Sequence, residues 1–143
     1  MNINKFKIEV NYNYTFEKMI LLGRYGLVYI DKETQYLSGV KNGKTKTTTM
    51  FTINFGYEIS SEYAVNELTG LGLRPANMFE VMTIGYKMPD LQTENQIVSF
   101  IHTPKKGKES VILGNDEKKG RCILVDSIEI VWGVETLILA SPI

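Results

Sequence analysis

The chain has 143 residues, of which 43% are hydrophobic and 22% are charged, proportions that suit a folded domain and argue against disorder. Sixteen basic and sixteen acidic residues give a formal net charge of zero, so the chain lacks the basic excess typical of nucleic-acid-binding proteins. One cysteine, Cys122, and one histidine, His102, exclude an internal disulfide and supply only two of the four ligands of a structural zinc site. We therefore expect one globular domain over residues 1–143, with no metal or cofactor.

The N-terminal segment, MNINKFKIEVNYNY, is polar and alternating, and it lacks the continuous apolar core of a signal peptide. No apolar run in the chain approaches the roughly 20 residues needed to span a bilayer. These features predict a cytoplasmic protein that is not associated with a membrane.

Two helices are predicted in the first half of the chain. The first begins near Thr15, whose hydroxyl can cap the N–H groups of the first turn, and it ends at Gly23 or Gly26. The second begins at Ser60 or Ser61 and stops at a Gly-Leu-Gly sequence.

A third helix is predicted after Pro75. Asn77 and Glu80 have the spacing of a capping box, although Asn replaces the usual Ser or Thr. Pro89 prevents this helix from extending further.

Strands are predicted over much of the remaining chain. Two of them, over residues 27–30 and 50–55, lie on either side of a polar segment, 38–49, which contains an Asn-Gly turn signal and is interpreted as a loop. In the second half, strands are predicted over residues 97–101, 110–113 and 136–140, and residues 122–125 and 128–132 are predicted to form either one bent strand or two. The last is apolar almost throughout, which favours a central place in the sheet or a covered edge, and residues 133–135 are interpreted as the hairpin turn before it.

Helices followed by a run of strands indicate the α+β class. We expect a mostly antiparallel sheet of five to seven strands, with about three short helices packed on one face.

Three short motifs lie in the middle of the chain: GLGLRPA at residues 70–76, PDLQ at 89–92 and IVSF at 97–100. This arrangement resembles small uncharacterised proteins of uncultivated bacteria and their phages, in which a G-x-RPA turn leads into a short helix, a P-x-LQ segment and an apolar strand. The resemblance implies a shared fold, and that family has no assigned activity. Caps and helix breakers also explain these residues. Arg74 is placed either to satisfy carbonyls at the end of the second helix or to pair with Glu80 or Asp90.

His102 and Cys122 are the two candidates for catalytic chemistry. His102 follows an apolar strand, but the sequence fixes no nucleophile or carboxylate beside it. Arg121 would lower the pKa of an exposed Cys122 thiol, whereas burial would make Cys122 an inert core residue. A surface histidine and a buried cysteine are the simpler interpretations.

No phosphate or metal site is predicted. Residues 39–45, GVKNGKT, end like a phosphate-binding loop, but their glycines are only four residues apart and no flanking strand and helix are predicted, so we interpret the match as chance. The carboxylates are scattered, and the acidic residues 115–117 are followed by two lysines, which suits a solvated turn rather than a calcium loop.

Basic residues gather in three predicted loops: Lys41, Lys44 and Lys46; Lys105, Lys106 and Lys108; Lys118, Lys119 and Arg121. Two of these loops meeting at one end of the sheet would form an anion-binding patch, with several tyrosines available for stacking. The alternative is that the lysines keep exposed hairpin tips soluble, and successive tips lie at opposite ends of a sheet.

The leading functional prediction is a non-enzymatic protein-interaction module, self-associating and encoded by a phage or mobile element if the resemblance holds. An apolar strand surface around Trp132, larger than three small helices can cover, would drive the association. The alternative is binding of nucleic acid or a nucleotide-like anion through the lysine loops, and the third possibility is an enzyme of unknown type. The predicted binding residues are Trp132, Arg74, Lys105, Lys106, Lys108, Lys44 and Lys46.

Overall fold

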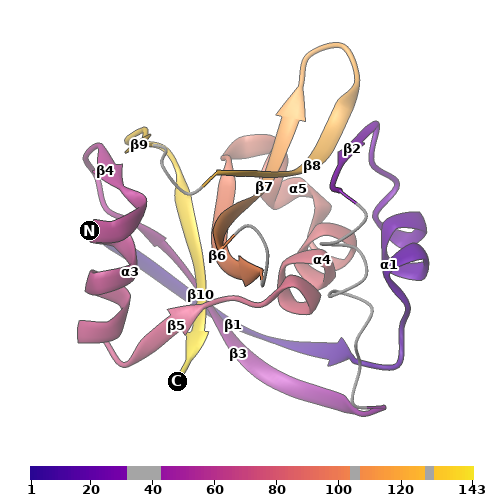
Figure 1. The fold of residues 1–143 in the computed structure, drawn as a ribbon, viewed down its shortest axis with the longest axis horizontal. Coiled ribbons are helices and arrows are strands. Elements are labelled where there is room, and N and C mark those ends of the chain that lie inside the picture. The colour runs from indigo at the N-terminus through magenta and orange to yellow at the C-terminus, as the bar shows by residue number, and fades with distance from the viewer. Residues whose placement is uncertain (32–42, 104–106, 128–130) are drawn as a thin grey trace.

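The computed structural model describes residues 1–31, 43–103, 107–127 and 131–143, and it has the predicted α+β class (Figure 1). Its strands are β1 (Asn2–Asn11), β2 (Leu27–Tyr29), β3 (Thr45–Asn54), β4 (Ile59–Ser60), β5 (Leu73–Pro75), β6 (Ile97–Thr103), β7 (Gly107–Asp116), β8 (Gly120–Ser127), β9 (Val131–Trp132) and β10 (Leu137–Pro142). Its helices in the described ranges are α1 (Phe16–Gly23), α3 (Ser61–Gly70), α4 (Met78–Lys87) and α5 (Pro89–Glu94). None of these helices is both long and apolar enough to cross a bilayer.

One large sheet organises the molecule. Its eight strands follow the order β1-β3-β10-β6-β7-β8-β2, with β5 paired to β10, and β4 and β9 form a separate two-stranded sheet. The large sheet is mostly antiparallel, as predicted, but it exceeds the expected five to seven strands. It also contains two parallel pairs, β10 with β6 and β2 with β8.

The predicted helix starts are confirmed because each depends on a short-range cap. Thr15 Oγ1 accepts a hydrogen bond from the Lys18 N–H, and Ser60 Oγ accepts one from the Tyr63 N–H. The capping box at the start of α4 is also complete: Asn77 Oδ1 accepts from the Glu80 N–H at 2.8 Å, and Glu80 Oε1 accepts from the Asn77 N–H at 2.8 Å.

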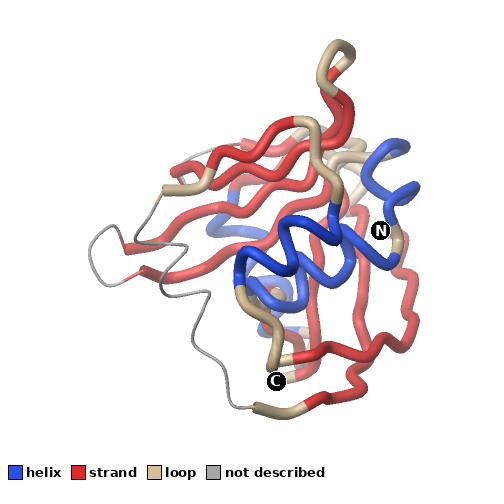
Figure 2. Tube along the Cα trace, turned by 90° about the vertical axis from the view of Figure 1, so that its right-hand side faces the viewer, coloured by secondary structure: helices blue, strands red, loops and turns tan. Residues whose placement is uncertain are grey.

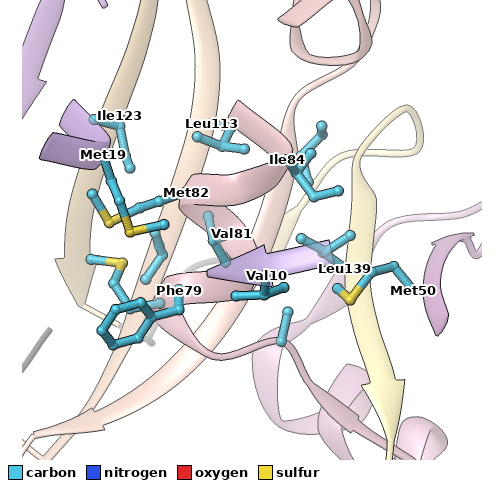
Figure 3. Packing of buried hydrophobic residues seen from close by; sticks show 14 of the residues in the cluster. Val10, Met19, Met50, Phe79, Val81, Met82, Ile84, Leu113, Ile123 and Leu139 are labelled. Atoms are coloured by element: carbon cyan, nitrogen blue, oxygen red, sulfur yellow. The ribbon is translucent and has the colours of Figure 1, made fainter. Parts of the chain in front are cut away.

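The prediction that all helices pack on one face is wrong. Figure 3 shows the core of one face, where side chains of α1 and α4 meet those of β1, β7, β8 and β10; we call this the α4-side core. Residues Ala64 and Leu68 of α3 instead pack with Val98, Phe100 and Ile138, which point from the opposite face, and we call this the α3-side core. Both faces of the central strands are apolar, so both need a covering layer.

The sheet is strongly curved. Figure 2 shows strands on both sides of the central helices, and α4 contacts both β1 and β7, which are separated by three strands in the sheet order. The curvature lets one short helix fill the inside of the sheet, where Val81, Met82 and Ile84 are almost fully buried.

Several predicted boundaries differ from the structure. Residues 45–49, expected in a loop, begin β3 and pair with β1, which itself was not predicted as a strand. The rest of the predicted loop through residue 42 lies outside the described residues. Residues 133–135 do form a turn, closed by the Thr136 N–H on the Gly133 carbonyl, but not a hairpin, because β9 pairs with β4 and β10 pairs with β3, β5 and β6. Pro89 does end α4, but it also starts α5 as the first helical residue.

Candidate functional site

β10 changes neighbour along one of its edges. Its first residues pair in parallel with β6 as far as Val98, and residues 140–142 pair antiparallel with β5. Between these two ladders, the Leu139 carbonyl accepts a hydrogen bond of 3.1 Å from the Ala76 N–H. Figure 1 shows the result, with β6 beside the upper part of β10 and β5 beside the lower part. β6 therefore loses one neighbour after Val98, although it stays paired with β7 as far as Thr103.

The end of β6 consequently carries main-chain groups without partners. Successive residues of a strand point their N–H and C=O groups toward opposite edges. The Gln96 carbonyl accepts from the Leu137 N–H at 2.8 Å, so the even-numbered residues of β6 face the β10 side. Phe100 and His102 therefore direct their N–H and C=O groups away from β7, and these groups have no hydrogen-bond partner within the described part of the chain.

Two hollows, of about 650 and about 590 Å³, flank this free edge. The first lies on the α3 side and includes Val131 of β9, and the second lies on the α4 side and includes Met78 and Phe79. Four residues line both hollows: Pro75, Phe100, Ile101 and His102. We call the free edge of residues 100–102, together with the hollow on each side, the β6 slot.

The described residues that line the β6 slot are mainly apolar and include few charged side chains. Glu62 and Lys108 line the first hollow, and Arg74 lines the second. Lys108 is the cross-strand partner of His102 on β7, and both residues are exposed. Because positive and negative side chains are mixed, the slot does not present one sign of charge to a ligand.

Arg74, one of the predicted binding residues, is held by an internal ion pair. Its guanidinium donates to both carboxylate oxygens of Glu80, at 2.8 and 3.2 Å, and to the Pro75 carbonyl at 3.0 Å. Glu80 is only 1% exposed, so this arginine neutralises a buried carboxylate. The predicted pairing of Arg74 with Glu80 is confirmed, and it fixes the β5–α4 turn that borders the slot.

Trp132, the predicted centre of an apolar surface, is part of the core. Its ring is 3% exposed and packs against Phe100, with ring centroids 6.3 Å apart. Its indole N–H donates to Ser61 Oγ at 2.8 Å. α3 covers the surface that the sequence led us to expect as exposed, because Ala64 and Leu68 of this helix pack in the same core as Trp132.

The lysines of the described ranges are spread over both ends of the sheet. Lys44 and Lys46 lie at the beginning of β3, Lys108 at the beginning of β7, and Lys118 and Lys119 in the turn between β7 and β8. Lys108 and that turn lie at opposite ends of β7, roughly 27 Å apart at about 3.3 Å per residue. Lys41, Lys105 and Lys106 lie outside the described residues.

His102 and Cys122 are not brought together either. His102 pairs with Lys108 near the beginning of β7, whereas Cys122 pairs with Gly114 near its end. The Cys122 side chain is buried, and burial raises the pKa of its thiol, which opposes reactivity at neutral pH. Arg121 does not activate this thiol, because its guanidinium is directed to other groups.

Arg121 has a structural role that the sequence did not reveal. Its guanidinium donates to the carbonyls of Gly85 and Gly23 and lies over the ring of Tyr25, 5.4 Å from the ring centroid. It also reaches Gln92 Oε1 at 3.4 Å. It thus joins β8 to α1, α4 and α5, and no local sequence signal could predict partners 98 and 36 residues away.

No cluster of three or more His, Cys, Asp or Glu residues that could hold a metal ion occurs over the described ranges. No protein-family model matches the chain, and no curated protein or solved structure matches it. The resemblance to phage-associated proteins therefore stays a prediction, and the site must be interpreted from its own geometry.

Proposed function

We propose that this protein is a non-enzymatic protein-interaction module that binds its partner at the β6 slot. The observation that carries the proposal is the free edge at Phe100 and His102, which lies between two hollows. Each hollow is within the range of about 300–1,000 Å³ that is usual for binding pockets. Mainly apolar walls with a few polar groups suit a polypeptide ligand better than a highly charged one.

The alternatives have less support. Catalysis needs convergent titratable groups, and His102 and Cys122 lie near opposite ends of β7. Anion binding through the lysine loops needs those loops to meet. Lys118 and Lys119 lie at the other end of β7 from Lys108. Lys44 and Lys46 lie at the same end of the sheet as Lys108, but β10 and β6 separate their strand from β7. A cytoplasmic location and a phage or mobile-element origin accompany this proposal as predictions.

The predicted self-association finds no support at the edge of β1. Over the described ranges β1 is an edge strand that pairs with β3, and on its other edge Lys87 Nζ donates to the Glu9 carbonyl at 2.8 Å. Lys5 and Lys7 are exposed on this strand, and lysines on an edge oppose pairing with a second copy. Light scattering after size-exclusion chromatography tests this prediction, and a monomer at high concentration would remove it.

Selection from a library of displayed random peptides tests binding at the slot. We expect enriched peptides to bind the folded protein, and Val131→Lys to weaken that binding by about tenfold because a lysine would occupy the first hollow. Val134→Lys is the matched control: Val134 is 52% exposed, close to the 57% of Val131, but it lines neither hollow of the slot.

Ionic strength provides the second comparison. Affinity for the enriched peptides should change by less than about threefold between low and moderately high salt, because few contacts between opposite charges are expected at the slot. Absence of any enriched peptide, or equal binding by the Val131→Lys variant and the wild type, would overturn the proposal. A steep loss of affinity with salt would favour the lysine loops instead.

A further inference from the structure

We propose that the β6 slot receives an extended segment of a partner protein as an added β-strand next to β6. This inference rests on the proposed function and specifies how the partner binds. Three features of the slot support it: the direction of the free main-chain groups, the positions of the two hollows, and the walls around the edge.

The free main-chain groups are arranged as those of a sheet edge. Phe100 and His102 each direct one N–H and one C=O toward the slot, two residues apart, which is the repeat that a neighbouring strand needs. In the rest of the β6 ladder this side is occupied by β10, whose pairing ends at Val98. An incoming strand would pair with β6 beyond Val98, where its pairing with β10 ends, and would satisfy up to four main-chain groups.

The two hollows lie where the side chains of such a strand would point. Neighbouring residues of a strand project to opposite faces of the sheet. The first hollow lies on the α3 side and the second on the α4 side, so consecutive ligand residues would enter different hollows. We therefore expect the ligand to carry two adjacent apolar residues, and to lack proline wherever its N–H must reach β6.

The walls favour a single segment over the edge of a second copy. The beginning of α3 and Val131 stand on one side of the free edge, and residues 76–79 stand on the other. At the base of the slot, Ser99 Oγ donates to the Ala76 carbonyl at 2.6 Å and ties β6 to the β5–α4 turn. A strand that belongs to another folded sheet brings neighbours and covering side chains with it, whereas an isolated extended segment does not.

Two substitutions at one position separate main-chain from side-chain recognition. His102→Pro removes the N–H that faces the slot but no hydrogen bond of the β6–β7 ladder, so we expect the fold to persist. His102→Ala removes the imidazole and keeps the N–H. We expect the selected peptides to lose at least about tenfold in affinity for the proline variant and less than about threefold for the alanine variant.

N-methylation of the selected peptide gives a second readout that does not depend on the folding of a variant. Replacing each ligand N–H in turn by N–CH₃ should abolish binding at alternate positions only, because every second N–H of a strand faces the same edge. Loss at every position, or at none, would contradict strand addition.

The outcomes distinguish this inference from the proposed function. Peptides that bind and depend on Val131, but tolerate His102→Pro and show no two-residue repeat on N-methylation, would overturn strand addition and leave the interaction module intact. Absence of any peptide binding would overturn both.

Discussion

The two ends of the β6–β7–β8 unit differ in whether their main-chain groups receive hydrogen bonds from side chains. At the end where β7 turns into β8, Arg121 donates to carbonyls of α1 and α4, and Gln92 Nε2 donates to the carbonyls of Gly114 and Cys122 at 2.8 and 3.1 Å. We call this the closed end. At the other end, which we call the open end, main-chain groups of Phe100 and His102 have no partner among the described residues and lie between two hollows.

This difference suggests that the residues that stabilise the fold and the residues proposed to bind a partner lie at opposite ends of this unit. Unpaired buried main-chain groups are costly, so folded proteins rarely leave several of them at one site without a ligand or water to satisfy them. The closed end uses long side chains to satisfy such groups internally. Under the proposal of strand addition, the open end keeps such groups for a partner. Three substitutions at the closed end test whether that end carries the larger share of the stability.

Gly26→Ala should have the largest effect. A Cβ on Gly26 would lie 1.5 Å from the main-chain oxygen of Lys119, so β2 and β8 would have to separate. The Gly26 N–H also donates to the Arg121 carbonyl at 2.7 Å. We expect the free energy of unfolding to fall by about 3 kcal/mol or more, as measured by urea denaturation.

Gly70→Ala is the control for that substitution. A Cβ at Gly70, the last residue of α3, meets nothing within 4 Å, so alanine should stabilise the helix by up to about 1 kcal/mol. Equal stability of the two alanine variants would show that β2 and β8 are not in close contact.

Arg121→Ala should have the next largest effect. It leaves the Gly85 and Gly23 carbonyls without their donor and removes the contact with the Tyr25 ring. Loss of hydrogen bonds from a charged donor predicts a fall of roughly 3 kcal/mol in the free energy of unfolding. Lys119→Ala, two residues earlier in an exposed turn, should change the free energy of unfolding by less than about 0.5 kcal/mol.

The Arg121→Ala variant also tests whether the closed end influences peptide binding at the open end. If the open end binds independently of the closed end, the folded Arg121→Ala protein should bind selected peptides with unchanged affinity. A matched loss of binding would show that the two ends are coupled.

Tyr25→Phe should have the smallest effect and the opposite sign. The Tyr25 hydroxyl is buried and has no hydrogen-bond partner in the described part of the chain, so removing it relieves an unsatisfied polar group. Phenylalanine keeps the ring beneath Arg121. We expect a gain of up to about 1 kcal/mol in the free energy of unfolding at neutral pH.

The pH dependence of that difference provides a second measurement. Burial raises the pKa of Tyr25 to about 12, an effect that the nearby Arg121 partly offsets. The unfolded chain therefore loses this proton at lower pH than the folded chain does. Wild-type stability should be unaffected below about pH 10 and should fall by on the order of 2–3 kcal/mol as the pH rises toward 12. The Tyr25→Phe protein should lack this component, so equal pH profiles of the two proteins would contradict the assignment.

Features that depend on neighbouring residues could be predicted from the sequence. The caps at Thr15, Ser60 and Asn77 each involve a partner three residues away, and the strand at residues 136–140 is buried in the sheet because almost all of it is apolar. The general α+β class follows from the order of such local elements.

Features that depend on distant pairing could not be predicted. The free edge of β6 exists only because β5, more than 20 residues earlier, takes the place beside β10. Trp132 seemed to belong to an exposed apolar surface because nothing in its local pattern shows that α3 covers it. Arg121 likewise has partners on three helices, so its charge alone suggested a loop for anion binding.

The position of β10 has a consequence for assembly. β10 follows every other strand in the chain, yet it is the only described strand that connects β3 to β6 within the sheet order. The β1–β3 pair and the β6–β7–β8 meander can each form earlier during synthesis, but they cannot join into one sheet until residues 137–142 have left the ribosome. Closing the sheet is therefore a late and long-range step, during which the edges of β3 and β6 stay exposed to aggregation or to chaperones.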